Sequence, residues 1–304
     1  MKTNRIIAIM AVLASLLSSC SSVPITGRHQ LNMVSESEVL QASLTQYSSY
    51  MKNAKRSEKK SQCEMVSRVG RRIAAATEAY LNSHGLSNEV KNFAWEFNLV
   101  KNKEINAFCM PGGKIVVYEG LMDIVSSDDE LAVVLGHEVA HAVAKHSQER
   151  MSQQVLAQYG AQALSIFTQG KSSTTQAVAN QVFGLGTNYG VMLPFSRKHE
   201  SEADKMGLVF MSIAGYNPDC ALTFWKKMSA SGNGNRSDFF SSHPSDAKRI
   251  AAIQKELPAI RQQYARGTYA GNGGRGAAGK QSTTQKKSST RKKSSTRKKS
   301  STKR

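Results

Sequence analysis

The stretch Gly136-His137-Glu138-Val139-Ala140-His141 decides the fold of this chain. It follows an apolar run, and together they predict a buried helix. Two histidines four residues apart lie one above the other on one helical face, so a single metal ion can bind both imidazoles. Glu138 can face the same cavity without binding the metal. This pattern is typical of zinc peptidases, in which two histidines bind zinc and a carboxylate moves the proton of the attacking water.

The residues before the motif predict where its helix begins. Ser127 and Glu130 have the spacing of a capping box, which satisfies free backbone N–H groups of the first turn. The apolar residues from Leu131 to Leu135 give the helix a buried side next to the histidines. The alternative is a buried helix whose two histidines are hydrogen-bonded internally. The whole pattern favours a catalytic centre with one zinc ion per chain.

The N-terminus has the features of an exported bacterial lipoprotein. Basic residues precede an apolar run over residues 6–17, which is too short to span a bilayer and suits a secretory signal. The run ends at Leu17-Ser18-Ser19-Cys20, which resembles a bacterial lipobox. The alternative is an ordinary signal peptide with a chance cysteine. We expect residues 1–19 to be removed and a lipid on Cys20 to anchor the protein to a membrane.

After two expected helices between residues 35 and 83, the apolar period changes to that of strands. Alternation around Phe97 predicts a half-buried strand, and residues 105–110 and 114–118 predict two more around a Pro-Gly-Gly turn. An exposed edge strand of such a sheet can hold an extended substrate by strand addition. A packing sheet with no substrate role is an equal alternative.

A second run combines carboxylates with an apolar face. The sequence from Ser196 onward predicts a helix on which Glu200 and Asp204 share one face with apolar residues. Two carboxylates on such a face should not be buried unpaired. Glu200 is therefore the candidate third zinc ligand, and Asp204 the candidate acceptor for the free ring N–H of a ligand histidine. The alternative is a surface salt-bridge face formed with the basic residues of this run: Arg197, Lys198 and Lys205.

These motifs together resemble the M48 family of gluzincin metallopeptidases, in particular its bacterial lipoprotein and periplasmic members. The resemblance, which covers roughly residues 23–264, rests on segments that are, in chain order, Pro24 to Leu31, Asn106 to Gly113, His137-Glu138-x-x-His141, Ser196 to Asp204, and His243-Pro244-Ser245 with Arg249-Ile250. The chain departs from larger envelope members, because we find no helical repeat domain after the catalytic one. It also departs from membrane-embedded members, because we expect no transmembrane helix.

The resemblance implies a zinc-dependent endopeptidase that acts on damaged or misassembled envelope proteins. It also implies that the strand Lys114-Ile115-Val116-Val117 is the substrate-binding edge. We expect an α+β, mainly helical zincin-like domain with a small β-sheet beside the His-Glu-x-x-His helix. The predicted location is the periplasmic side of the outer membrane. The expected parts are a signal peptide (1–19), a lipidated linker (20–34), the peptidase domain (35–265) and a disordered tail (266–304).

His243 has two candidate roles with opposite effects, since the resemblance places it facing the zinc. It could donate to the oxyanion of the tetrahedral intermediate, which is the role we favour by a small margin. It could instead occupy the open coordination position and hold the enzyme inactive. Arg249 is expected to brace this corner. His146 follows His141 by five residues, which is not ligand spacing, so we interpret it as structural, and we assign no role to His199.

The C-terminal region differs in composition from the rest of the chain. The net charge is +19, and residues 280–304 contribute 11 basic residues and no acidic ones, with Lys-Lys-Ser-Ser-Thr recurring every six residues. Such a tail cannot bury apolar surface and should be disordered. Its charge suits an anionic envelope surface, while nucleic acid is a poor partner for an exported lipoprotein. A merely solvated tail is an equal alternative.

Two other functions remain open at this point. A zinc-stabilised lipoprotein could bind unfolded chains at an edge strand, as a chaperone does, without cutting them. Alternatively, the function could lie in the basic tail as a polyanion-binding anchor. The peptidase interpretation is favoured because Glu138 stands where a general base is needed between two metal ligands.

Overall fold

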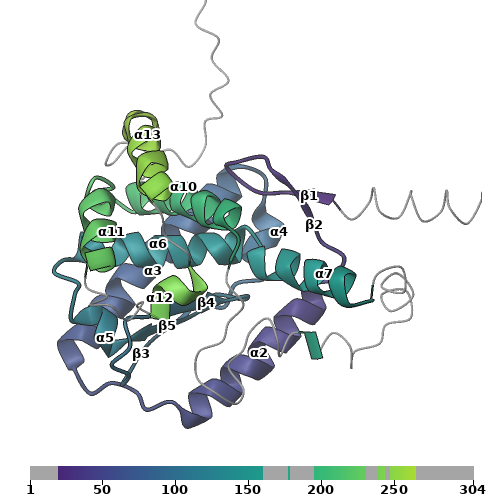
Figure 1. The fold of residues 1–304 in the computed structure, drawn as a ribbon, viewed down its shortest axis with the longest axis horizontal. Helices are drawn as coiled ribbons and strands as arrows, with labels where there is room; N and C mark the ends of the chain where they lie inside the picture. The colour runs from purple at the N-terminus through teal and green to yellow at the C-terminus, as the bar shows by residue number, and fades with distance from the viewer. Residues whose placement is uncertain (1–19, 160–176, 179–194, 231–237, 244–246, 265–304) are drawn as a thin grey trace, which may run out of the picture. The chain divides into compact units, whose positions relative to one another are not determined.

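The computed structural model describes residues 20–159, 177–178, 195–230, 238–243 and 247–264 (Figure 1). The expected signal peptide and basic tail lie outside these residues. Among the helices in these ranges, none has the length and apolar character needed to cross a membrane.

The N-terminal residues belong to the folded domain. Strands β1 (Cys20–Ser22) and β2 (His29–Leu31) form an antiparallel pair. Val23 and Val34 are fully buried, and the backbone N–H of Met33 donates to Ser152 Oγ at 2.9 Å. The prediction of a linker over residues 20–34 is therefore wrong for residues 21–34. Apolar side chains of this segment are buried in the domain, and its backbone forms hydrogen bonds with the domain.

Two long helices follow, as predicted. In α2 (Glu36–Asn53), Ser35 and Glu38 form a complete capping box. Helix α3 (Lys60–Ser83) buries an apolar stripe against α6 and α10, and the short α4 (Ser87–Val90) leads into the sheet. These helices form a frame around the catalytic-motif helix and contribute no side chain to its polar centre.

The sheet has three strands in the order β3–β5–β4. They are β3 (Glu96–Val100), β4 (Ala107–Met110) and β5 (Lys114–Tyr118), with β5 parallel to β3 and antiparallel to β4. The predicted β4–β5 hairpin is confirmed, and its turn uses the positive φ angles of Gly112 and Gly113, 88° and 79°.

The predicted substrate edge, Lys114 to Val117, is wrong in one respect: β5 is the central strand and has partners on both sides. Its side chains are buried, and the Lys114 ammonium donates to Glu96 Oε1 at 2.6 Å. Strand β4 is an edge, and it packs against the catalytic-motif helix. The correction arises because a hairpin pattern predicts pairing within the hairpin but not the parallel insertion of an earlier strand.

Two helices cross closely above the sheet. These are α6 (Asp128–Val143), which carries the catalytic motif, and α10 (Arg197–Ile213) (Figure 1). Their backbones meet at Gly136 and Gly207, where a Cβ on Gly207 would lie 2.8 Å from the backbone nitrogen of His137. Only two facing glycines allow this approach, which brings the carboxylates of α10 to the histidines of α6.

The remaining elements close the domain around this crossing. They are α5 (Glu119–Met122), α7 (His146–Tyr159), α11 (Cys220–Ala230), α12 (Asp238–Ser242) and α13 (Ala247–Gln263). The structure is mainly helical with a small sheet beside α6, so the predicted α+β zincin-like fold class is confirmed.

Candidate metal centre

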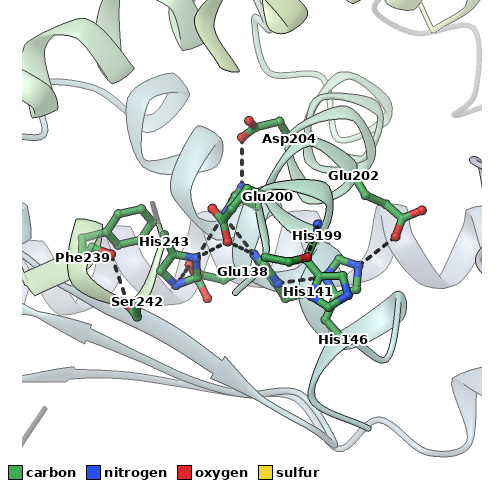
Figure 2. A network of polar contacts seen from close by, with 12 residues as sticks. Glu138, His141, His146, His199, Glu200, Glu202, Asp204, Phe239, Ser242 and His243 are labelled. Atoms are coloured by element: carbon green, nitrogen blue, oxygen red, sulfur yellow. Dashed lines mark hydrogen bonds and ion pairs between the residues drawn. The ribbon is translucent and has the colours of Figure 1, made fainter. Parts of the chain in front are cut away.

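Four side chains converge between the sheet and the crossing helices. His137 and His141 come from α6, Glu200 from the first turn of α10, and His243 from the residue after α12. All four are buried, and one ligand-type atom from each lies within 4.8 Å of those of the others. Figure 2 shows Glu200 between the rings of His141 and His243.

The spacing of these atoms suits a tetrahedral ion. The two ligand nitrogens, Nε2 of His137 and Nε2 of His141, are 3.1 Å apart. Glu200 Oε2 lies 3.4 Å from Nε2 of His137, and Glu200 Oε1 lies 3.4 Å from Nε2 of His141. Zinc bonds of about 2.0–2.1 Å in a tetrahedron separate ligand atoms by about 3.3–3.4 Å. Two imidazole nitrogens and a carboxylate oxygen are also the donor types that zinc prefers, so the residues fit the ion.

Asp204, the candidate partner of a ligand histidine, lies against the ring of His137. The Nδ1 of this ring lies 3.0 Å from Asp204 Oδ1. Arg249 donates to the same carboxylate at 2.5 and 2.9 Å and lies 3.0 Å from Glu200 Oε2. Although burial opposes ionisation, Arg249 and His137 lower the pKa of Asp204. Asp204 therefore stays ionised and can fix the His137 tautomer that presents Nε2 to the metal.

Glu138 lies beside the four clustered side chains and is not one of them. The backbone N–H of Cys109, on edge strand β4, donates to its Oε2 at 3.2 Å. Its Oε1 accepts no hydrogen bond from the described part of the chain and lies 3.5 Å from His243 Nε2. Burial raises the pKa of Glu138 above its ordinary value, which suits a group that must take and return a proton.

His243 occupies a position with ligand-like distances. Its Nδ1 lies 3.3 Å from His137 Nε2 and 3.2 Å from Glu200 Oε1, close to the tetrahedral separations above. Its ring stacks on Phe239 at 4.4 Å between centroids. The backbone N–H of Phe195 donates to the carbonyl of Ser242, which anchors the residue before His243. The nitrogen therefore stands where a fourth ligand would stand.

Sequence reasoning missed a buried polar group on the other side of His141. His146, for which the sequence predicts a structural role, has its Nδ1 2.9 Å from Nδ1 of His141. Its Nε2 lies 2.9 Å from Glu202, which in turn is paired with Arg28 at 2.8 Å. His146 can turn back because Lys145 adopts a left-handed conformation, with φ of 55°, between α6 and α7. Spacing along one helix could not show this.

Comparison with known proteins identifies the family. The model of peptidase family M48 matches residues 66–257, which include both histidines of α6, Glu200 and His243. The chain belongs to peptidase family M48. The resemblance noted from the sequence motifs is confirmed. Its residues Glu138 and Arg249 also lie within the matched range.

Several curated relatives are metallopeptidases from bacteria and mitochondria. The mitochondrial metalloendopeptidase OMA1 of Schizosaccharomyces pombe is 38% identical over 195 residues, covering 64% of this chain and 52% of that protein. The metalloprotease LoiP of Escherichia coli is 27% identical, covering 62% and 74%. The β-barrel assembly-enhancing protease of Escherichia coli is 28% identical, covering 60% and 39%. The chain thus spans about half the length of the yeast relative.

Proposed function

We propose that this protein is a zinc-dependent endopeptidase that hydrolyses damaged or misassembled proteins in a bacterial cell envelope. The observation that carries the proposal is the buried set of His137, His141 and Glu200 at tetrahedral spacing, with the uncommitted carboxylate of Glu138 beside it. Family membership and the relatives, which are metalloendopeptidases and metalloproteases, support the same reaction class.

The mechanism assigns one step to each residue. The two histidines and Glu200 would hold zinc, which supplies Lewis-acid polarisation of the peptide carbonyl and acidifies a water molecule. Glu138 takes the proton from the attacking water and passes it to the leaving amine. Asp204 keeps His137 in the tautomer that presents Nε2, and Arg249 holds Asp204.

Strand β4 is the proposed substrate edge, in place of β5. It forms the side of the sheet nearest α6, and its Cys109 N–H already points to Glu138. An extended peptide added along β4 would pass the base and the ligand set within one strand width, about 4.8 Å.

For His243 we propose the inhibitory role over the oxyanion role. Its Nδ1 lies at ligand distance from both His137 and Glu200, while its Nε2 lies against Glu138. In this position the ring excludes water from the base. His243→Ala should then raise basal cleavage of an unfolded substrate, whereas loss of an oxyanion donor would lower kcat by on the order of a hundredfold. Unchanged zinc affinity and activity would remove His243 from the site.

The envelope location rests on the N-terminal sequence and on two bacterial relatives. The Leu-Ser-Ser-Cys20 run supports lipid anchoring, and the basic tail supports contact with anionic envelope surfaces. Fractionation of Cys20→Ala tests the anchor: the variant should leave the membrane fraction. Salt-resistant membrane association of that variant would contradict lipidation. Deletion of residues 267–304 tests the tail and should leave proteolysis unchanged.

Glu138→Gln tests the reaction itself. The amide cannot accept the water proton, so cleavage of unfolded casein should fall by on the order of a thousandfold while zinc stays bound. Asp128→Asn, which removes an exposed ion pair with Arg68, serves as the control and should cleave normally. If wild-type protein prevents aggregation of casein but never cleaves it, and Glu138→Gln does the same, the chaperone alternative replaces the peptidase.

A further inference from the structure

His141 is supported on its outer side by a second histidine and a carboxylate. Its Nδ1 lies 2.9 Å from Nδ1 of His146, whose Nε2 lies 2.9 Å from Oε2 of Glu202. All three side chains are buried. Since His141 presents Nε2 to the metal centre, the proton of the neutral ring is on Nδ1 and His146 accepts it. His146 then carries its own proton on Nε2, where Glu202 accepts it. One proton arrangement therefore satisfies every member of the series.

Glu202 is held in turn by the loop between β1 and β2. The Thr26 hydroxyl donates to its Oε1, and Arg28 Nε donates to its Oε2 at 2.8 Å. The other two guanidinium nitrogens of Arg28 donate to Glu149 at 3.0 and 2.7 Å. The Arg28 side chain is only 12% exposed, and the two carboxylates 8% and 5%. Arg28 thus bridges two buried carboxylates, one of which faces the metal-ligand series.

The backbone of this loop is strained in a way that its contacts explain. Ile25 has φ of 68°, an uncommon value for a β-branched residue. The turn is closed by hydrogen bonds from Val23 N to Arg28 O and from Gly27 N to Val23 O, at 2.8 and 2.9 Å. Such outliers persist where surrounding contacts over-determine the conformation. Here the turn delivers the side chains of residues 26 and 28 to the same carboxylate, 174 or more residues away in sequence.

The position of the series distinguishes it from an ordinary buried ion pair. In many zinc sites a carboxylate accepts the second ring N–H of a ligand histidine and so fixes its tautomer and orientation. Glu202 has this relation to His141, but acts through the ring of His146. Figure 2 shows Glu202 reaching toward His146 while Asp204, two residues later on α10, points elsewhere. The same helix thus supports both ligand histidines.

We propose that the turn formed by residues 23–28 is a positioning element of the metal centre. Thr26 and Arg28 fix Glu202, Glu202 fixes His146, and His146 fixes the orientation and tautomer of His141. None of these residues contacts the metal or the substrate. The inference rests on the zinc centre proposed above. It follows that zinc binding and folding of the β1–β2 hairpin, which begins at the proposed lipidation site, stabilise each other. The reason is that linkage between two events is reciprocal.

Zinc affinity, measured by competition with a chromogenic chelator, tests the proposal on the full chain. Arg28→Gln, Glu202→Gln and His146→Leu should each weaken zinc binding tenfold to a hundredfold. The double variant R28Q/H146L should be no weaker than the weaker single variant, because the residues act in series. Arg28→Lys should recover part of the affinity. Arg68→Gln, which removes an exposed arginine–carboxylate pair, is the matched control and should bind zinc as the wild type does.

The outcomes separate this proposal from the metal centre itself. If the wild type binds no zinc, or Glu200→Ala binds as tightly, the metal centre is wrong and the positioning role falls with it. A second outcome would overturn the proposal. In it, Glu200→Ala loses zinc, while Arg28→Gln, Glu202→Gln and His146→Leu keep wild-type zinc affinity and only have a lower Tm in excess chelator. These residues would then have a structural role alone.

A measurement on the unmutated chain covers variants that do not fold. Zinc should slow amide hydrogen exchange in residues 22–31 of the hairpin, relative to protein in excess chelator. Residues 36–53 of α2 serve as the internal reference, because they contribute no member of the series. Equal exchange in the hairpin with and without zinc would contradict the proposed coupling.

Discussion

Two series of contacts, one short and one long, support the two α6 histidines of the proposed metal centre; we call them the direct arm and the long arm. His137 contacts Asp204 directly, and Arg249 from α13 holds that carboxylate. His141 reaches Glu202 only through His146, and Arg28 from the N-terminal turn holds that carboxylate. Each arm ends in an arginine, but the arginines come from opposite ends of the domain. The centre is therefore supported by segments near both ends of the part of the chain that the structure describes.

The direct arm lies closer to the metal centre, because its arginine contacts Glu200 itself. Arg249 is 4% exposed and lies within 3.0 Å of both Asp204 and the ligand Glu200. Arg28 contacts none of the four side chains of the metal centre, and its side chain is 12% exposed. Loss of the direct arm should therefore cost more in both folding and metal binding.

The largest expected difference is in stability. Arg249→Gln removes the arginine from two carboxylates whose side chains are only 4% and 1% exposed, and should reduce the free energy of unfolding by about 3–5 kcal/mol in excess chelator. Arg28→Gln should cost about 1–3 kcal/mol, because Arg28 is more exposed and the Thr26 hydroxyl still donates to Glu202. Urea unfolding of the two variants and the wild type gives the comparison. Equal losses, or a larger loss for Arg28→Gln, would mean that the two arms do not differ as described.

Metal affinity should show the same order. Asp204→Asn replaces the acceptor of the His137 ring N–H with an amide and should weaken zinc binding by on the order of a hundredfold. Glu202→Gln acts through an intervening ring, so its effect should lie nearer tenfold. Chelator competition measures both. A weaker effect for Asp204→Asn than for Glu202→Gln would reverse the assigned importance of the arms.

Acid pH should weaken the ion pair between Arg28, at the end of the long arm, and Glu149, and so lower the free energy of unfolding. Burial works against ionisation of Glu149, yet His199 and Arg28 lower its pKa to about 2. A carboxyl whose folded pKa is depressed stabilises the fold above its ordinary pKa of about 4.5, and loses that contribution as pH falls toward 2.

The effect is measured as the stability difference between wild type and Glu149→Gln in excess chelator. The difference should be about 2 kcal/mol at pH 7 and should shrink steadily below pH 4.5. Asp128→Asn, at an exposed ion pair, should differ from the wild type by less than about 1 kcal/mol. A difference for Glu149→Gln that stayed constant down to pH 3 would show that its ion pairs do not stabilise the fold.

Sequence patterns indicated the direct arm, from His137 to Asp204, but not the long arm from His141 to Arg28, and the reason is physical. Asp204 lies one helical turn after Glu200, so their shared face follows from the period of α10. His146 reaches His141 only because Lys145 breaks the helix with a positive φ, and Arg28 arrives from a separate hairpin. Periodicity predicts which residues of one helix or strand share a face, but it does not predict contacts between separate elements.

The sheet shows the same boundary between local and long-range order. The hairpin of β4 and β5 follows from alternation and a Gly-Gly turn, and it is present. The parallel pairing of β3 with β5 depends on contacts that are distant in sequence. Because of this pairing, the strand that we expected to be the substrate edge is the central strand. The buried residues of α6 and the N-cap that Ser127 forms with Glu130 were predictable, because each depends on residues within a few positions.

The central claim is that His137, His141 and Glu200 hold one zinc ion that serves proteolysis. The most direct test is to count zinc by native mass spectrometry in wild type, Glu200→Ala and Glu138→Gln while measuring casein cleavage. We predict one zinc per chain with cleavage for the wild type, one zinc without cleavage for Glu138→Gln, and neither for Glu200→Ala at low chelator concentration. Full zinc content and full cleavage in Glu200→Ala would contradict the account.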